Sequence, residues 1–189
     1  MKLSPTALAG VMIVETDLFA DERGWFMESF NAPRLNAALQ AMGLPTAPTF
    51  VQDNHSCSRA GVLRGLHYQL PPHAQGKLVR VVKGSVWDVT VDLRRSSAQF
   101  GRWAGFELSA ANRRQLWIPP GFAHGFLALE DDTHFLYKTT DVYAKECERS
   151  IRWDDPMLAI AWPLPAGQHA QLAVKDAQAP WFGGADSFD

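Results

Sequence analysis

Residues 76–93 read GKLVRVVKGSVWDVTVDL and predict two β-strands joined by a tight turn. Valine dominates both halves, and its β-branched side chain favours the extended backbone of a strand. Lys83-Gly84 lies between the halves and supplies the turn. Asp88 and Asp92 interrupt the valines of the second half, so apolar and polar side chains alternate imperfectly there. The stretch therefore predicts β-structure at the centre of the chain.

Short strands continue on both sides of this stretch, separated by Gly, Pro, Asn and Asp. The sequence contains neither a GxGxxG motif nor a P-loop, which excludes the common nucleotide-binding βαβ units. Many short strands without intervening helices predict an all-β sandwich or barrel. The further strands are expected at residues 11–15, 101–108, 115–118, 125–129 and 134–139, and residues 21–24, DERG, predict a turn before the apolar stretch that follows.

One helix is predicted, at residues 32–42 near the N-terminus. Pro33 suits the first helical turn, because its fixed φ angle is already helical. Leu35 and Leu39 recur with Met42 at helical spacing, and a glycine follows directly as a stop signal. We expect these three apolar side chains to form the buried face of the helix.

The size of the chain fits one globular domain. It has 189 residues, of which 47% are apolar and 20% are charged. We therefore expect a single domain over residues 1–189, with an irregular tail from Pro163 onward that wraps around the body.

Charge and cysteine content exclude several classes of protein. The net charge of −2 disfavours non-specific nucleic-acid binding, which needs a basic face. No apolar run approaches the roughly 20 residues of a transmembrane helix, and residues 1–10 lack the apolar core of a signal peptide. Two cysteines give no disulfide framework. We expect a cytoplasmic protein with neither a nucleic-acid nor a membrane partner.

Polar residues gather in motifs inside otherwise apolar strands. The spacing PxGxxH at residues 119–124 resembles the second motif of the cupin jelly rolls. In metal-binding cupins this histidine joins an HxH pair on an earlier strand. The corresponding stretch here is His67-Tyr68-Gln69, so Gln69 breaks the ligand set, and no metal is expected there.

Four motifs occur in a characteristic order: GVLRGLHYQ at 61–69, QGKLVRV at 75–81, IPPGFAHGF at 118–126 and WDDP at 153–156. Together they resemble the dTDP-4-dehydrorhamnose 3,5-epimerase family, and the resemblance extends over about residues 11–180. It implies a cupin-type jelly roll that is metal-free, needs no cofactor and forms a homodimer. It also implies a dTDP-4-keto-6-deoxy sugar as substrate, converted into its 4-keto-rhamnose epimer on the route to dTDP-L-rhamnose.

The implied reaction explains the residue types. C3 and C5 of a 4-keto sugar flank the carbonyl, so their protons are acidic because the resulting carbanion delocalises onto the C4 oxygen. Epimerisation needs a base on one face of the sugar, an acid on the other, and a donor or cation for the enolate oxygen. No electrons leave the sugar, so no nicotinamide cofactor is expected.

The resemblance assigns four catalytic residues. His67 is the expected base, because an imidazole titrates near neutral pH. Lys77 is expected beside the C4 oxygen, where its ammonium group stabilises negative charge. Tyr137 matches the proton donor of the family, and Asp176 is expected to orient His67.

Further residues are expected to contact the substrate. Arginine suits a diphosphate because its guanidinium is planar and permanently charged. The aromatic ring of Tyr143 is expected to stack on thymine, and Phe26 to form part of the pocket wall. His124 contacts the substrate or supports His67, and the sequence leaves both roles open. The expected set is Arg23, Phe26, Glu28, Gln52, Asn54, Arg64, His124, Tyr143, Glu148 and Lys175.

Three alternatives stay open at this point. The first is an epimerase that inverts only C3 or only C5 of a related sugar, since such enzymes share the base and the lysine. The second is a metal-dependent cupin, which Gln69 disfavours. The third is a non-catalytic sugar-nucleotide-binding protein, which has no need of His67, Lys77 and Tyr137 together.

Other polar residues show no functional pattern in the sequence. His55, His73, His134 and His169 lack an obvious partner and are expected to be structural or solvated. Cys57 is expected to behave as a small buried hydrophobic residue.

Overall fold

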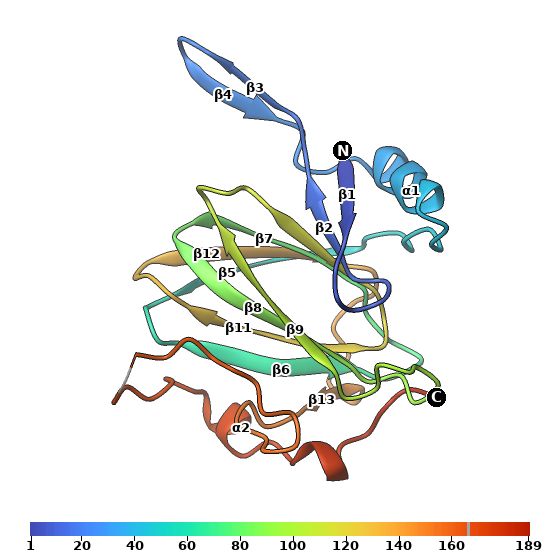
Figure 1. Ribbon diagram of the computed structural model, residues 1–189, viewed down its shortest axis with the longest axis vertical. Coiled ribbons are helices and arrows are strands. Elements are labelled where there is room, and N and C mark those ends of the chain that lie inside the picture. The colour runs from blue at the N-terminus through green and yellow to red at the C-terminus, as the bar shows by residue number, and fades with distance from the viewer. Residues whose placement is uncertain (166) are drawn as a thin grey trace.

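The computed structural model describes residues 1–165 and 167–189, and it consists mainly of two antiparallel sheets packed face to face (Figure 1). The six-stranded sheet has the order β1-β2-β10-β7-β12-β5, and the five-stranded sheet has the order β13-β6-β11-β8-β9. The strands of the first sheet are β1 (Lys2–Pro5), β2 (Met12–Glu15), β10 (Gln115–Ile118), β7 (Lys77–Lys83), β12 (Thr133–Thr139) and β5 (Gln52–Ser58). Those of the second are β13 (Glu148–Ser150), β6 (Leu63–Gln69), β11 (Phe122–Ala128), β8 (Ser85–Asp92) and β9 (Trp103–Ser109).

The turn at Gly84 carries the chain from one sheet to the other. Strands β7 and β8 flank it as predicted, yet β7 pairs with β10 and β12 while β8 pairs with β11 and β9. Gly84 has a φ of +75°, and a Cβ atom there would lie 2.3 Å from Thr133 Oγ1. Glycine is therefore required at this corner both for its backbone conformation and for space.

Apolar side chains from both sheets fill the space between them. Val79 and Val81 of β7 meet Val86 of β8, and all three are buried. Phe126 and Phe135 stack across the interior with ring centroids 4.2 Å apart. Burial of each such side chain contributes about 1.5–3 kcal/mol, so this core holds the sheets together and fixes the positions of their strands.

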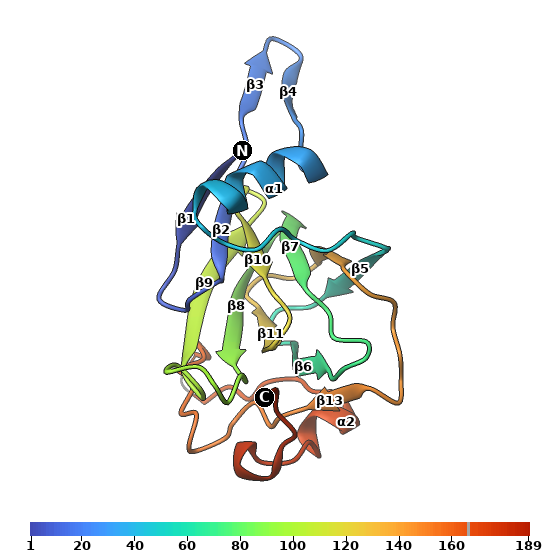
Figure 2. The ribbon, with the colours of Figure 1, turned by 90° about the vertical axis from the view of Figure 1, so that its right-hand side faces the viewer.

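Helix α1 (Ala32–Ala41) covers the outer face of the six-stranded sheet (Figure 2). The Asn31 side chain caps it by accepting a hydrogen bond from the Arg34 backbone N–H at 3.1 Å. Leu35 and Leu39 are buried against Met12, Val14 and Trp117 of the sheet. The helix is confirmed, but the expectation for Met42 is wrong: it follows the last turn and is 43% exposed.

The tail wraps around the five-stranded sheet, as expected. It is mostly irregular, with a single-turn helix α2 (Val174–Ala177) and a 3-10 turn η1 (Phe182–Gly184) that the sequence did not reveal. The Tyr68 hydroxyl donates to the backbone oxygen of Asp186 at 2.5 Å, and Arg149 pairs with the Asp186 carboxylate at 2.7 Å. These bonds attach the tail to β6 and β13, and α2 packs directly against β6.

A hairpin arm, residues 18–27, projects from the body (Figure 1). It consists of β3 (Leu18–Asp21) and β4 (Gly24–Met27), which pair with each other in a separate two-stranded sheet. The turn between them lies at residues 21–24, where the sequence predicts one. Among the described residues, no helix has both the length and the apolar character needed to span a membrane.

Candidate active site

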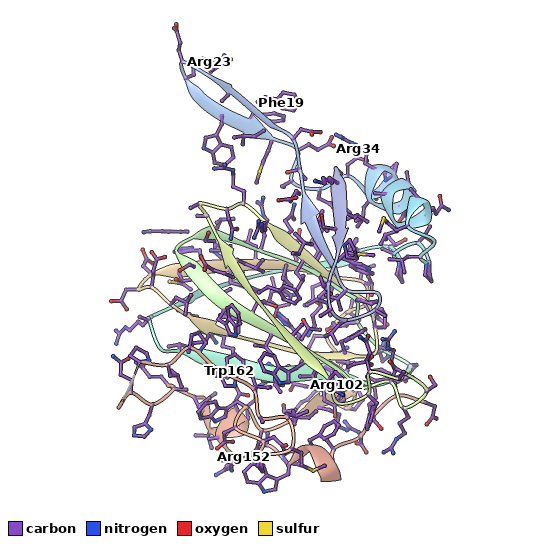
Figure 3. All side chains as sticks on the ribbon, in the orientation of Figure 1. Phe19, Arg23, Arg34, Arg102, Arg152 and Trp162 are labelled. Atoms are coloured by element: carbon purple, nitrogen blue, oxygen red, sulfur yellow. The ribbon has the colours of Figure 1, made fainter. Side chains whose placement is uncertain are left out.

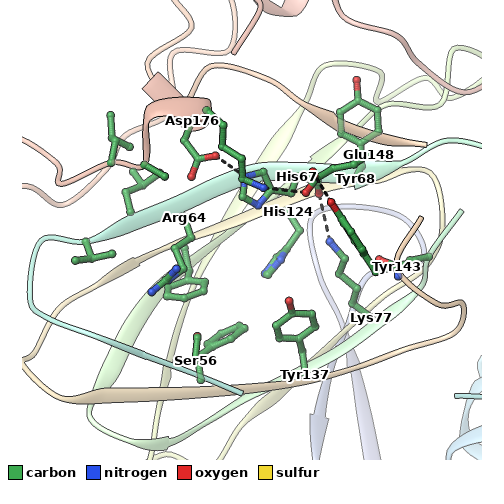
Figure 4. Close-up of a pocket in the computed structure, with 18 of the residues that line it drawn as sticks. Ser56, Arg64, His67, Tyr68, Lys77, His124, Tyr137, Tyr143, Glu148 and Asp176 are labelled. Atoms are coloured by element: carbon green, nitrogen blue, oxygen red, sulfur yellow. Dashed lines mark hydrogen bonds and ion pairs between the residues drawn. The ribbon is translucent and has the colours of Figure 1, made fainter. Parts of the chain in front are cut away.

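One cavity of about 550 Å³ opens between the two sheets, close to the tail (Figure 4). Its walls come from β6 and β11 of one sheet, from β7 and β12 of the other, and from α2. Nine of the residues expected to act on or bind the substrate line it. They are Arg64, His67, Lys77, His124, Tyr137, Tyr143, Glu148, Lys175 and Asp176.

His67 and Asp176 form a tight pair at one wall of the cavity. A ring nitrogen of His67 on β6 lies 2.6 Å from a carboxylate oxygen of Asp176 on α2. The second carboxylate oxygen accepts a 3.4 Å hydrogen bond from the Gly65 backbone N–H, and the carboxylate is almost completely buried. Because a carboxylate accepts hydrogen bonds, the bonded ring nitrogen carries the proton and the other keeps a lone pair. The pair therefore presents an oriented base.

Lys77 lies between the two walls and is buried. Its Nζ donates a 3.3 Å hydrogen bond to the backbone oxygen of His67. Burial lowers the pKa of Lys77 to about 8, although the charges of Asp88 and Glu148 partly oppose this effect. An ammonium group in a region of low dielectric is well suited to stabilise a developing oxyanion.

His124, which lines the cavity, and Asp88 behind it form a second histidine–carboxylate pair. A ring nitrogen of His124 lies 2.8 Å from a carboxylate oxygen of Asp88, and both residues are buried. Burial raises the pKa of Asp88, while the charges of His124 and Lys77 act in the opposite direction. No role for Asp88 was predicted from the sequence, where its one signal is a carboxylate in a valine-rich strand.

Tyr137 stands on the wall opposite His67 and points into the cavity (Figure 4). It comes from β12 of the six-stranded sheet, whereas His67 comes from β6 of the five-stranded sheet. Burial raises the pKa of Tyr137, so its hydroxyl keeps its proton at neutral pH. A base and an acid therefore face the cavity from opposite sides.

Charged and aromatic groups cluster at the mouth of the cavity. The Tyr143 hydroxyl donates to Glu148 at 3.1 Å, and the ammonium of Lys175 pairs with the same carboxylate at 2.9 Å. Burial is the largest single effect and raises the pKa of Glu148, but the hydrogen bonds from Lys175 and Tyr143 together with the charge of Lys175 outweigh it, so the pKa of Glu148 is lowered. Gln52 accepts a 3.0 Å bond from the Tyr143 backbone N–H, which links strand β5 to this cluster.

Five expected substrate contacts do not line the cavity, and Gln52, which bonds to Tyr143 at its mouth, is one of them. Asn54 bonds to Gln52 at 2.9 Å and lines a smaller neighbouring cavity together with Tyr137. Arg23 and Phe26 are on the arm, and Figure 3 shows Arg23 at its tip, far from the tail. Glu28 lies at the base of the arm, where it bonds to Asn31 and Arg34. The site within one chain therefore lacks the three residues from the arm.

Gln69 occupies the position of a metal ligand in metal-binding cupins, but here its side chain forms hydrogen bonds with backbone groups. Its side-chain oxygen accepts from the Ala144 backbone N–H at 2.9 Å. Its amide nitrogen donates to the backbone oxygens of His73 and Val142 at 2.7 and 3.1 Å. The glutamine thus fixes the loop that precedes Glu148 at the cavity mouth.

Outside the cavity, the expectation that Cys57 is buried was wrong, whereas His55, His73 and His134 are at least partly exposed, as expected, but have partners that the sequence did not reveal. Cys57 is exposed and donates a 3.2 Å hydrogen bond to Asp132, because it lies on the outward face of edge strand β5. His55 and His134 bond to each other at 2.9 Å, and His73 lies 3.3 Å from Asp141. The pairing of β5 with β12, which brings His55 and His134 together, was not visible in the sequence.

Comparison with known proteins places this geometry in a family. The family model described as dTDP-4-dehydrorhamnose 3,5-epimerase matches residues 5–183. The chain belongs to the dTDP-4-dehydrorhamnose 3,5-epimerase family. The members of this family are isomerases, and the jelly-roll fold expected from the sequence is confirmed.

Individual members of the epimerase family match over almost their whole length. The dTDP-4-dehydrorhamnose 3,5-epimerase of Pseudomonas aeruginosa is 53% identical over 189 residues, covering 100% of this chain and 99% of the relative. That of Shigella flexneri is 52% identical over 188 residues, with the same coverage. A Legionella pneumophila dTDP-6-deoxy-D-glucose-3,5-epimerase, crystallised in complex with dTDP-4-keto-L-rhamnose, superposes with a TM-score of 0.89. It is 48% identical, and the match covers 98% of this chain and 94% of that one.

Proposed function

We propose that this protein inverts C3 and C5 of dTDP-4-dehydro-6-deoxy-D-glucose and so produces dTDP-4-dehydro-L-rhamnose, a precursor of dTDP-L-rhamnose. The named activity of the relatives and the ligand of the Legionella enzyme support this substrate. The observation that carries the proposal is the placement of His67 and Tyr137 on opposite sheets, with buried Lys77 between them.

The reaction begins with proton abstraction beside the ketone. The free ring nitrogen of His67 takes the proton from C3 or C5, and the C–H electron pair moves into an enolate whose charge rests on the C4 oxygen. Asp176 holds the resulting imidazolium by charge and by its 2.6 Å contact. The ammonium of Lys77 stabilises the enolate oxygen, because it is already in place and desolvated.

Reprotonation from the opposite face inverts the carbon. Tyr137 delivers its proton to the face that His67 did not attack, and solvent returns the proton to the tyrosinate. The same sequence of steps at the second carbon completes the double epimerisation. Hydrogen moves as a proton at each carbon, so the reaction balances without an electron acceptor and needs no nicotinamide cofactor.

The mouth of the cavity binds the nucleotide in this proposal. Lys175 and Arg64 offer positive charge to the diphosphate, which would compete with Glu148 for the Lys175 ammonium. Tyr143 is 54% exposed beside them and offers a ring face to thymine. A few local cations suffice for this ligand, although the chain as a whole carries a net charge of −2.

We further propose that the protein is a homodimer and that each arm completes the site of its partner. The arm exposes Phe19, Trp25 and Phe26 at 61%, 57% and 67%, an apolar surface that is costly to leave in water. It carries Arg23, Phe26 and, at its base, Glu28, the expected substrate contacts that the cavity of the same chain lacks. A two-fold dimer would place both arms in equivalent positions.

We propose a cytoplasmic location from the biosynthetic role of the related epimerases. Cell fractionation with an antibody to this chain tests it. Recovery in the cytoplasmic fraction supports the location, and recovery in the periplasmic or membrane fraction contradicts it.

The stereochemistry of the product tests the proposed reaction. Incubation of the purified protein with dTDP-4-dehydro-6-deoxy-D-glucose, followed by proton NMR of the products, is expected to show the sugar inverted at both C3 and C5. A product inverted at one carbon only would identify a monoepimerase. An unchanged sugar that still binds to the protein would indicate a non-catalytic binding protein, and activity that a chelator abolishes would indicate a metal-dependent cupin.

A further inference from the structure

A second cluster of polar side chains lies on the outer face of the six-stranded sheet. Side chains alternate along a strand, so Ser56 of β5 lines the catalytic cavity while the adjacent Cys57 points the opposite way. Cys57 is paired in register with His134 of β12. Asp132, in the turn before β12, completes this Cys57–Asp132–His134 cluster, which contributes nothing to the proposed epimerisation.

The three side chains converge on a small volume. Sγ of Cys57 and Nε2 of His134 lie 3.2 and 3.1 Å from the same carboxylate oxygen of Asp132. The three potential ligand atoms all lie within 4.8 Å of one another. In tetrahedral zinc sites the metal lies about 2.0–2.1 Å from nitrogen and about 2.3 Å from sulfur, so neighbouring ligand atoms are roughly 3.3–3.7 Å apart. Small side-chain rotations bring the cluster to that spacing.

Two neighbouring side chains form hydrogen bonds with the candidate ligands, as the outer neighbours of metal ligands do. The other ring nitrogen of His134 bonds to His55 at 2.9 Å, which orients the imidazole and leaves Nε2 facing Cys57 and Asp132. The second oxygen of Asp132 bonds to the ammonium of Lys83, so the oxygen nearest the thiol and imidazole is available to an ion. Such contacts fix the orientation and tautomer of first-sphere ligands in known metal sites.

We propose that Cys57, Asp132 and His134 bind a divalent transition-metal ion of the Zn²⁺ type, with water in the fourth position. Thiolate, imidazole and carboxylate together suit zinc and its neighbours better than they suit magnesium or calcium. Binding releases the thiol proton of Cys57 to solvent, and the thiolate then bonds to the metal. Cys57 and Asp132 are exposed, so an ion reaches the cluster directly from solvent. The bound ion joins edge strand β5 to the turn that leads into β12.

Titration with cobalt tests the proposal on the full chain after removal of metals with a chelator. We expect CoCl₂ to produce a sulfur-to-cobalt charge-transfer band that saturates at one ion per chain and is displaced by ZnCl₂. Cys57→Ser is expected to abolish the band. His134→Gln is expected to weaken binding at least about tenfold, and His55→Ala, which removes only an outer partner, by about tenfold.

His73→Gln is the matched control, because His73 also lies beside a carboxylate, that of Asp141, but has no place in the cluster. It is expected to bind cobalt as the wild type does. Thermal unfolding gives a second readout: ZnCl₂ should raise the midpoint of the wild type and leave that of Cys57→Ser unchanged. Absence of the band in folded wild type, or unaltered cobalt binding in Cys57→Ser or His134→Gln, would overturn the proposal.

Discussion

At the scale of single residues, the proposed chemistry depends on the pair of His67 and Asp176. The base must be neutral, correctly oriented and able to hold a proton. The 2.6 Å contact with a buried carboxylate orients the ring and stabilises the protonated form.

We predict that His67→Asn lowers kcat by about 10²–10⁴-fold. Asp176→Asn is expected to cost at least about 100-fold, because an amide holds the ring in the wrong tautomer. Steady-state rates of variants with native circular dichroism measure both. Full turnover in Asp176→Asn would remove the pair from the mechanism.

In the proposed mechanism, Lys77 sets the alkaline limit of activity. Its pKa of about 8 means that the ammonium form, which stabilises the enolate, is lost as pH rises through that value. Burial raises the pKa of Tyr137 above its usual value, so the tyrosine deprotonates only at higher pH. We therefore predict that kcat/KM falls above about pH 8. In Lys77→Arg, the residual kcat/KM should show no decline near pH 8, because the guanidinium group stays charged. A decline at the same pH in that variant would assign it to another group.

Sequence motifs reveal the residues that line the cavity better than the residues that support them. His67, Lys77 and Tyr137 lie in recognisable motifs, and the structure brings them around one cavity. Asp88 lies 36 positions before its partner His124, and the two meet only because β8 pairs with β11. Such a pairing depends on sheet register, which a local pattern of residues does not contain.

At the scale of elements, the close approach of β6 and β11 positions both histidines. Register pairs His67 with His124 across these strands, and Gly65 lies at their closest approach. A Cβ atom on Gly65 would lie 2.5 Å from the Cα of Gly125, and the φ of Gly65 is +141°. The two strands therefore cannot keep this spacing with a larger residue at position 65.

We predict that Gly65→Ala lowers the free energy of unfolding by about 2–4 kcal/mol and reduces kcat, because the strands must separate. Gly43→Ala is the matched control. Gly43 also has a positive φ, +71°, but nothing lies within 4 Å of its missing Cβ, so only about 1 kcal/mol is expected. Urea denaturation measures both variants. Equal losses would show that backbone conformation, not the strand crossing, sets the cost.

The elements show where sequence patterns succeed and fail. Valine-rich stretches and the cap signals around α1 predicted β7, β8 and the helix closely, because these signals are local. The strand expected at residues 125–129 actually begins at Phe122, so His124 lies within it. Helix α2 was missed because four residues carry too little periodicity, and contacts with the body hold it in place.

At the scale of the whole molecule, the arm is the feature that one chain does not explain. It projects from the body, exposes aromatic side chains and carries residues expected at the substrate (Figure 1). The sequence predicted the turn at the tip of the arm. It did not predict that the arm extends away from the body, because that position depends on contacts outside the chain.

Mixed dimers test whether the arm acts on the partner. We predict that Arg23→Ala and His67→Asn are each nearly inactive alone. When the two variants are co-expressed in equal amounts, about a quarter of all active sites should be functional. Half of the dimers are then mixed, and one of the two sites in each combines an intact pocket with an intact arm. Light scattering should report the mass of two chains. Activity no greater than the sum of the separate variants would place the arm in its own chain or exclude the dimer.

The central claim is that inversion proceeds by proton exchange beside the ketone, between His67 on one wall and Tyr137 on the other. Reaction of dTDP-4-dehydro-6-deoxy-D-glucose in deuterated water, read by NMR at each carbon, tests it most directly. Deuterium is expected at both C3 and C5 of the wild-type product, and none above background in His67→Asn. A product that is inverted at C3 and C5 yet retains its original hydrogens there would contradict it.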